Sequence, residues 1–320
     1  MFPLTLNRSR NRGVISAAAA AVADPLFDYV SLLLNTTSTN GAQNNTFLDS
    51  STNNFSITRN GNTTQGTFSP FNPTAAWDAG TNGGSGYFDG TGDDLRSANA
   101  GAAANLGATW TVELWVYPSN VSGTGAIVNV NINTANTGVN IYRNGATITV
   151  DDGVTGGTGP SGGTLVANTW QHVAVVADGT NTKIYLNGTQ VGSTFSGTVT
   201  LGTPTHFWVG ASFSGLSNWT GYLSNARIVK GTAVYTAAFT PPTAPLTAIT
   251  NTSLLCNFTN AGIFDSASGN DLETVGNAQV STTQAKWGTT SMAFDGTGDW
   301  LLNIDKPALR LGTAAFTIEM

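Results

Sequence analysis

Three aspartates lie close together on one glycine-containing stretch, the run from Tyr87 to Asp94 that reads YFDGTGDD. Carboxylate oxygens are the hard ligands that Ca²⁺ prefers, so Asp89, Asp93 and Asp94 are candidate ligands of a calcium ion. A tight turn that needs aspartate and glycine explains the same residues without a metal. Both interpretations stay open, and a calcium site is one prediction from this stretch.

Aromatic side chains that could stack against sugar rings form a second candidate site, made of Trp115, Tyr117, Trp208 and Trp219. Such rings combine a large apolar face with a polar edge, which suits a partly wet binding surface. Trp219 lies in a polar run, Ser217–Thr220, and is predicted to be the most exposed of the four. Trp115 and Trp208 equally suit the core of a β protein. The sequence therefore predicts glycan binding, with a packing role as the alternative.

The acidic residues do not have the spacing of a glycosidase. A retaining hydrolase needs a nucleophile and an acid about 5 Å apart. The glutamates are Glu113, Glu273 and Glu319, and no second acid lies two or four residues from Glu113. The two histidines, His172 and His206, lie in no nucleophile-elbow or zinc-protease pattern. We therefore expect no catalytic residues and no enzymatic activity.

The composition is typical of a β protein with many turns. Of 320 residues, 38 are glycine and only 9% are charged, and the long runs that build helices are missing. The net charge of −6 offers no basic patch for phosphates, so nucleic acid is not an expected partner. No apolar run approaches the roughly 18 residues of a membrane span. The single cysteine, Cys256, excludes an intrachain disulfide and should pack as a small apolar group.

The clearest strand, Trp110–Pro118, alternates between two faces. One face carries Trp110, Val112, Leu114 and Val116, and the other carries Thr111, Glu113, Trp115 and Tyr117. Hairpin turns are predicted at Asn144-Gly145, Asp178-Gly179 and Asn187-Gly188, because these dipeptides tolerate positive φ. Short strands joined by such turns, with no helix between them, predict an all-β fold, namely an antiparallel jelly-roll sandwich.

The sequence repeats its own opening. Phe88-Asp89-Gly90 returns as Phe294-Asp295-Gly296, a shift of 206 residues (88 to 294). A repeat of this period indicates duplication of a whole domain. The two copies also begin with similar strands, Tyr29–Leu34 and Thr252–Cys256. Each opening strand is followed by an Asp-Ser element, at Asp49-Ser50 in the first copy and at Asp265-Ser266 in the second.

The repeat predicts four parts of the chain. They are an N-terminal arm (1–27), a jelly-roll domain (28–240), a proline-rich linker (241–251) and the start of a second domain (252–320). The second copy stops within a predicted strand, so we expect the natural chain to continue beyond Met320. The alternative is that this fragment pairs its strand edges with another protomer.

The first residues allow two interpretations. Residues 1–27 show no β alternation, and Arg8, Arg10 and Arg12 precede the alanine-rich segment Val14–Ala23. This pattern could be a secretory signal cleaved after Ala23. We favour a retained arm that docks on a larger assembly, because the apolar region is mostly alanine and the segment before it is long.

Five motifs carry a family resemblance when they are read in order: Phe88-Asp89-Gly90, Thr111–Val116, Trp170–Ala174, Tyr185–Gly188, and Gly221–Leu223 with Arg227-Ile228. Together they resemble the laminin-G-like branch of the concanavalin A-like lectin and glucanase superfamily, over about residues 29–240. The resemblance implies a jelly roll, and members often bind calcium. Glucanases of this superfamily use two glutamates and an aspartate on one strand, a set that this chain lacks.

A narrower resemblance lies in Arg227–Tyr235, which runs into Phe239–Leu246. These segments are similar to laminin-G-like modules in structural proteins of tailed bacteriophages, notably marine ones. The resemblance implies a non-enzymatic virion protein, such as a tail fibre, an appendage or a capsid-decorating module. Its arm would contact other virion proteins, its modules would meet host-surface glycans, and we expect a homo-oligomer. The alternative is a secreted or cell-surface bacterial lectin-like adhesin, which requires cleavage at Ala23.

Overall fold

The computed structural model describes residues 33–36, 47–71, 78–132, 135–152, 159–199, 203–212, 217–259, 263–265, 272–275, 279–285, 290–303, 309–313 and 315–320. For residues 35–36, 79, 132, 135–137, 263–265, 272–275 and 303 it describes the backbone alone. The predicted arm, its cleavage point at Ala23 and most of the opening strand Tyr29–Leu34 lie outside these residues.

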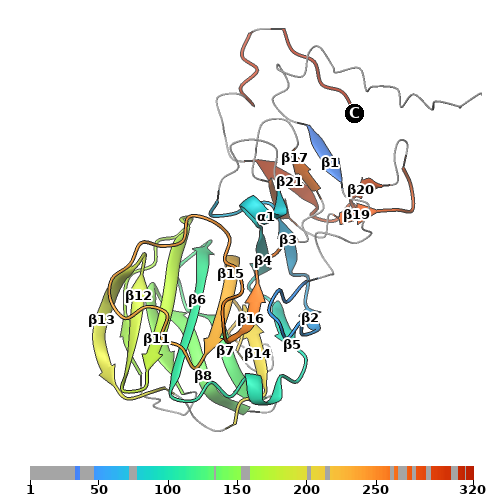
Figure 1. Ribbon diagram of the computed structural model, residues 1–320. Coiled ribbons are helices and arrows are strands. Elements are labelled where there is room, and N and C mark those ends of the chain that lie inside the picture. Colours follow the sequence, from blue (N-terminus) through green and yellow to red (C-terminus); the bar gives the residue numbers. More distant parts are fainter. Residues whose placement is uncertain are drawn as a thin grey trace, which may run out of the picture. The chain divides into compact units, whose positions relative to one another are not determined.

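Two antiparallel sheets face each other (Figure 1). The first, which we call the β6 sheet, has eight strands. Their order is β13 (Thr189–Ser196), β12 (Asn181–Leu186), β11 (Gln171–Asp178), β6 (Thr109–Pro118), β15 (Thr220–Lys230), β4 (Ser85–Asp89) and β3 (Thr64–Gly66), and β16 (Thr252–Cys256) also pairs with β15. Every pairing is antiparallel, which confirms the predicted jelly-roll sandwich.

The second sheet has seven strands. Their order is β10 (Ser161–Gly162), β9 (Thr147–Asp151), β8 (Ala135–Asn144), β7 (Thr124–Ile132), β14 (His206–Val209), β5 (Asp94–Ser97) and β2 (Ile57–Asn60). Three further pairs are β1 (Leu34–Thr36) with β17 (Ile263–Asp265), β18 (Leu272–Val275) with β21 (Trp300–Asn303), and β19 (Gln279–Ser281) with β20 (Ser291–Ala293). Helical pieces among the described residues include α1 (Ala79–Asn82) and a short 3-10 turn (Gly101–Ala103). In the described part of the chain, no helix is long and apolar enough to span a membrane.

The main core lies between the two sheets, and β6 supplies its centre. Trp110, Val112, Leu114 and Val116 are all buried there, which confirms the predicted alternation of this strand. Side chains of β7, β8 and β11 meet them in the same cluster. The opposite side chains of β6, from Thr111 to Tyr117, therefore face outward from the sandwich, and they form the floor of the region described below.

The predicted hairpins are present at all three positions. β8 turns into β9 after Asn144, and Gly145 has a φ of 58°. β11 turns into β12 at Gly179, with a φ of 93°, and β12 turns into β13 at Asn187 and Gly188, with φ values of 50° and 79°. These left-handed conformations are inexpensive for Gly and Asn, which is why the dipeptides predicted the turns.

After β15 the chain returns across the outer face of the β6 sheet as a segment that we call the strap, residues 231–251 (Figure 1, orange). Val234 N donates to Oγ1 of Thr111, and Phe239 N donates to the carbonyl of Gly188. Closer to β16, Leu246 is buried and its N–H donates to Oδ1 of Asn225. The predicted proline-rich linker, residues 241–251, is thus the second half of a segment that packs on the sheet.

The strand that opens the second copy lies in the first sandwich. β16 pairs with the second half of β15, and Leu254, Cys256 and Phe258 join the main core. Burial raises the pKa of the Cys256 thiol, and the side chain packs as the small apolar group that the sequence predicts. The division into domains at residues 240–252 remains a prediction from the repeat.

Candidate functional site

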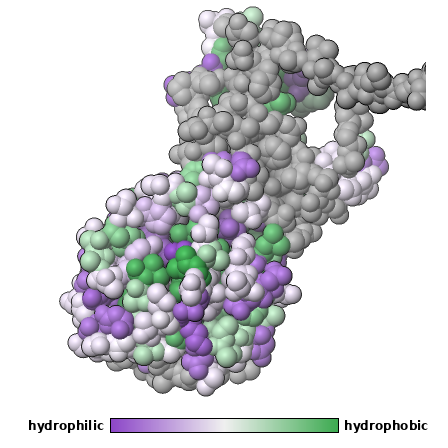
Figure 2. Space-filling model, viewed as in Figure 1, coloured by the Kyte–Doolittle hydropathy of each residue, from purple (hydrophilic) through white to green (hydrophobic). Residues whose placement is uncertain are grey.

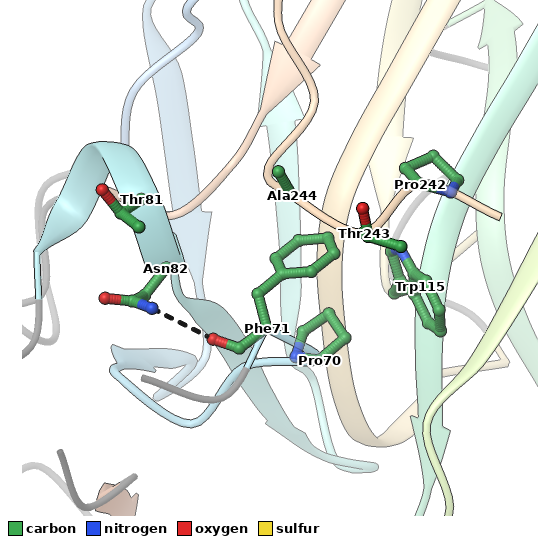
Figure 3. Close-up of a pocket in the computed structure, with 8 residues that line it drawn as sticks. All are labelled: Pro70, Phe71, Thr81, Asn82, Trp115, Pro242, Thr243 and Ala244. Atoms are coloured by element: carbon green, nitrogen blue, oxygen red, sulfur yellow. Dashed lines mark hydrogen bonds between the residues drawn. The ribbon is translucent and has the colours of Figure 1, made fainter. Parts of the chain in front are cut away.

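A hollow of about 440 Å³ opens on the outer face of the β6 sheet, over Trp115. Its walls come from the stretch after β3 and the helix α1, which are close in sequence, and from the strap, which is about 160 residues further along the chain. The lining residues are Pro70, Phe71, Thr81, Asn82, Trp115, Pro242, Thr243 and Ala244 (Figure 3). Trp115 is half-buried at the floor, and the ring of Phe71 meets it edge-on at 5.8 Å.

The wall opposite the strap is held by Asn82. Its Nδ2 donates to the carbonyl of Phe71 at 3.3 Å (Figure 3), and its Oδ1 accepts from Asp78 N at 3.0 Å. Its own carbonyl accepts from Oγ of Ser69 at 2.6 Å. These bonds tie α1 to Phe71, so the hollow has a preformed rim. Nε1 of Trp115 is buried and makes no hydrogen bond with the described residues.

Tyr117 lies two residues further along β6 on the same face and is half-buried. It belongs to an aromatic cluster, with ring centroids 5.1 Å from Phe68, 5.4 Å from Trp170 and 5.8 Å from Tyr222. Figure 2 shows hydrophobic residues, in green, gathered on the visible face of the sandwich. Trp170 was not among the predicted site residues. The pairing of Gln171 with Val116 places it beside Tyr117, a relation that only the sheet register reveals.

The structure places the other two tryptophans elsewhere. The predicted exposure of Trp219 is wrong, since its side chain is 0% exposed and lies in the main core under the guanidinium of Arg143. Trp208 is 1% exposed, with the guanidinium of Arg96 5.1 Å from its ring. The polar neighbours of Trp219 in sequence say nothing about the face on which its ring packs. Of the four predicted aromatic residues, only Trp115 and Tyr117 lie together with partly accessible rings.

A buried ionic cluster lies beside the hollow and is centred on Glu113 of β6. Its Oε1 accepts from Nε and Nη2 of Arg227 at 2.9 and 2.5 Å, and its Oε2 accepts from the hydroxyl of Tyr235 at 2.7 Å. Nε2 of His172 lies 3.3 Å from Oε2, an ion-pair distance without the alignment of a hydrogen bond. Nη1 of Arg227 donates to the carbonyl of Thr247. The cluster therefore holds both ends of the strap.

The Glu113 carboxylate is ionised in this setting. Burial raises its pKa, but the imidazole of His172 and the charge of Arg227 lower it more, so the pKa lies below its usual range. Around it, the ring of Tyr235 stacks on Phe239 at 3.6 Å, and Phe239 meets His172 edge-on at 5.7 Å. Because both carboxylate oxygens are occupied and the residue is fully buried, Glu113 has neither a free oxygen nor access to a substrate.

The predicted calcium ligands are engaged in turn geometry. Asp93 is buried, and its oxygens accept from the N–H groups of Asp89 and Asn62, each at 2.8 Å. Asp94 accepts from Nδ2 of Asn60 at 2.7 Å, while the exposed Asp89 accepts from Thr91 N. In the described part of the chain, no three His, Cys, Asp or Glu side chains are grouped to hold a metal ion. Calcium binding by Asp89, Asp93 and Asp94 remains a prediction from the sequence.

Asp93 should make stability depend on pH. Burial raises its pKa from 3.8 to about 6, so between these values the folded protein keeps a proton that the unfolded chain releases. We expect stability to fall as pH rises through this window, by roughly 1 kcal/mol per pH unit at most. In Asp93→Asn this fall should shrink, as measured by urea unfolding between pH 4 and 6.5. Asp299→Asn is the control, because Asp299 repeats the same hydrogen bond at a more exposed position. Equal slopes in wild type and Asp93→Asn would contradict the assignment.

Comparison with known proteins gives one family match. Residues 89–234 match the family model Laminin_G_3, described as the concanavalin A-like lectin/glucanases superfamily. The matched region runs from the Asp89 loop into the strap and contains Trp115, Tyr117 and Glu113. A search of curated proteins found no match.

Three solved structures illustrate the likeness to known folds. Domain 4 of AbnA, a GH43 extracellular arabinanase from Geobacillus stearothermophilus, in complex with arabinotriose, is 19% identical, with 60% of this chain and 95% of that chain covered and a TM-score of 0.39. Mouse laminin alpha1 domains LG4-5 are 13% identical, covering 55% and 47%, with a TM-score of 0.37. A SAP-like pentraxin from Limulus polyphemus is 13% identical, covering 65% and 96%, with a TM-score of 0.38.

Proposed function

Taking the laminin-G-like match of residues 89–234 as the premise, we propose that this chain is a non-catalytic module that binds glycans through the hollow over Trp115. The observation that carries the proposal is the half-buried indole at the floor of a preformed hollow of about 440 Å³. That volume lies within the range of small-ligand sites. A sugar ring offers an apolar face to the indole, and its hydroxyls can bond to the polar rim.

The rim has groups of the required kind. Thr81 and Thr243 are exposed at opposite sides of the hollow and carry hydroxyls that both donate and accept. The buried N–H of Trp115 lacks an acceptor among the described residues, and a small shift of the ring would offer it to a ligand oxygen. Tyr117 and Trp170 extend the aromatic surface along the same face of the sheet.

We also propose that the module has no catalytic activity, because no carboxyl group of the described residues is placed to act on a ligand in the hollow. Glu113, two residues before Trp115 on β6, is paired with Arg227 and closed off by Tyr235. None of the residues lining the hollow is acidic. A glycosidase needs two carboxyl groups on either side of the scissile bond. An assay on laminarin tests this point, and turnover would contradict it.

Replacing Trp115 by Ala should weaken glycan binding at least tenfold, because the stacking surface at the floor of the hollow is lost. A glycan array screened with the wild-type chain, with calcium and with a chelator, identifies the ligand and tests the predicted calcium dependence. Titration calorimetry with that ligand then measures the variant. The control is Trp300→Ala, which removes a half-exposed indole of β21 that is not among the residues lining the hollow. Equal losses in both variants, or none in Trp115→Ala, would overturn the assignment.

We also propose that the module belongs to a virion structural protein, such as a tail fibre, an appendage or a capsid-decorating protein, that forms homo-oligomers. The support is the sequence of the strap and the end of β15, which are the segments similar to phage laminin-G-like modules. The arm, residues 1–27, would attach it to other virion proteins. The competing proposal is a secreted lectin-like adhesin. Mass spectrometry of the mature N-terminus separates them, since a chain that starts at Asp24 would support secretion and an intact start at Met1 or Phe2 would exclude it by this signal.

A further inference from the structure

The two copies of the repeat each open with the same strand motif, Ser-Leu-Leu-x-Asn. It reads Ser31-Leu32-Leu33-Leu34-Asn35 in the first copy and Ser253-Leu254-Leu255-Cys256-Asn257 in the second. The motif is followed by Asp49-Ser50 after 14 residues in the first copy (35 to 49) and by Asp265-Ser266 after 8 in the second (257 to 265). In position along the chain, each strand therefore has an Asp-Ser element of its own.

The structure pairs each strand with the element of the other copy. The second-copy strand, β16, lies against Asp49 of the first copy: Leu255 N donates to Oδ1 of Asp49 at 3.0 Å, and Ser50 N donates to the carbonyl of Leu255 at 2.7 Å. The first-copy strand, β1, pairs with β17 of the second copy, with Leu34 opposite Asp265. Leu34 also packs on Val280 of the second copy, as do Met292 and Leu301. The two opening strands have thus exchanged partners, an arrangement that we call crossed.

The edge of β15 and the segment Asp49–Asn53 together form the slot that holds β16. Their contacts with β16 involve residue types that the first-copy strand shares. The slot's polar contacts reach the carbonyl of Ser253 from Nδ2 of Asn53, both backbone groups of Leu255, and the side chain of Asn257 from Oγ of Ser50. Its apolar side takes Leu254 and Cys256 into the main core. Serine, both leucines and asparagine recur in Ser31–Asn35, and the only difference is leucine in place of cysteine. The polar contacts of the slot therefore fit either strand, whereas the residue after the motif differs: it is Phe258, buried in the main core, in the second copy and Thr36 in the first.

We infer that the edge of β15 from Ala226 to Val229, together with Asp49–Asn53, is an acceptor site for a Ser-Leu-Leu-x-Asn strand, and that the chain's own Ser31–Asn35 is its second occupant. Asp49 is anchored at the slot, and 14 extended residues reach up to about 45 Å, so the first-copy strand can return to it. Its return releases β16 to its own Asp265 element. Both arrangements contain the same number of strand pairs. The crossed arrangement joins the two copies through these pairs, whereas the uncrossed arrangement leaves each copy paired only with its own segments.

Disulfide trapping in the full chain tests this inference, because Cys256 is the single native cysteine. Ala226 and Cys256 are opposite each other in the β15–β16 pairing, so Ala226→Cys should form a 226–256 disulfide on mild oxidation. Leu34 holds the motif position of Cys256. The triple variant Ala226→Cys, Leu34→Cys, Cys256→Ser should therefore form an intrachain 34–226 disulfide, identified by non-reducing peptide mass spectrometry.

The inference is overturned if Ala226→Cys cross-links to Cys256 while the triple variant gives no 34–226 bond. It is also overturned if that bond appears only in covalent dimers, because the occupant would then come from a second copy. A second variant tests the inference independently, in case the triple variant does not fold. Cys256→Leu makes the two five-residue motifs identical, and the slot should accept it with a melting temperature within a few degrees of wild type. A collapse of the melting temperature in Cys256→Leu would show that the slot rejects the first-copy strand.

Discussion

Replacing Arg227 by Met should lower the free energy of unfolding by about 3–5 kcal/mol, because it leaves the Glu113 carboxylate charged and buried without its main partner. Glu113 is 0% exposed and Arg227 is 6% exposed, so water cannot replace the lost bonds at little cost. The bond from Nη1 to the carbonyl of Thr247 is lost as well, which loosens the end of the strap. Urea unfolding at neutral pH, followed by tryptophan fluorescence, measures the change.

The double variant Glu113→Leu, Arg227→Met is the matched control. Removing both charges abolishes the unpaired carboxylate, so the double variant should be more stable than Arg227→Met alone. With Glu113→Leu measured as well, the coupling energy is the loss in the double variant minus the sum of the two single losses. Tyr235 then loses its acceptor, so recovery to the wild-type value is not expected. If the two single losses simply added in the double variant, the pair would not be the energetic unit that the distances indicate.

Replacing Gly188 by Ala should cost about 2–4 kcal/mol and should also weaken glycan binding. Gly188 has a φ of 79°, which L-residues rarely adopt, and an added Cβ would overlap the carbonyl of Phe239 in the strap. The strap must then move, and its residues Pro242–Ala244 form one wall of the hollow. Thermal unfolding and calorimetry with the ligand from the array measure the two effects.

Gly179→Ala separates the two causes of this loss. Gly179 lies in the preceding hairpin with a φ of 93°, but its added Cβ would meet only Oγ1 of Thr109 at 3.3 Å. This variant therefore has similar backbone strain without displacing the strap. We expect it to lose about 1–2 kcal/mol of stability and to bind the ligand normally. Equal binding by the two variants would show that the strap does not shape the hollow.

Local patterns predicted the framework well. The alternation of Trp110–Pro118 placed β6 with one face in the core, and the Asn-Gly and Asp-Gly dipeptides marked the three hairpins. Both signals depend on neighbours within a few residues, because strand side chains alternate and positive φ is a property of single residues. Such features are the same in any fold that uses the segment as a strand or a turn.

The candidate site was predicted only in part. Trp115 and Tyr117 share a face because they are two residues apart, and the strand pattern alone placed them together. Trp170 was missed, because its place beside Tyr117 depends on how β11 pairs with β6. Trp219 was misplaced, because its polar neighbours in sequence are at the surface while its own ring turns inward against Arg143.

The sequence by itself determined the class of fold, the central strand Trp110–Pro118, three hairpin turns and the existence of a repeat, since each follows from short-range periodicity or from a direct match of residues. Only the tertiary structure decided that the strap covers the β6 sheet and forms one wall of the hollow, that Glu113 meets Arg227 across 114 positions of the chain, and that β16 completes the first sandwich. The physical reason is that these contacts join distant segments. Their formation depends on the register of whole strands and on which surfaces remain to be buried, and no local pattern encodes either one.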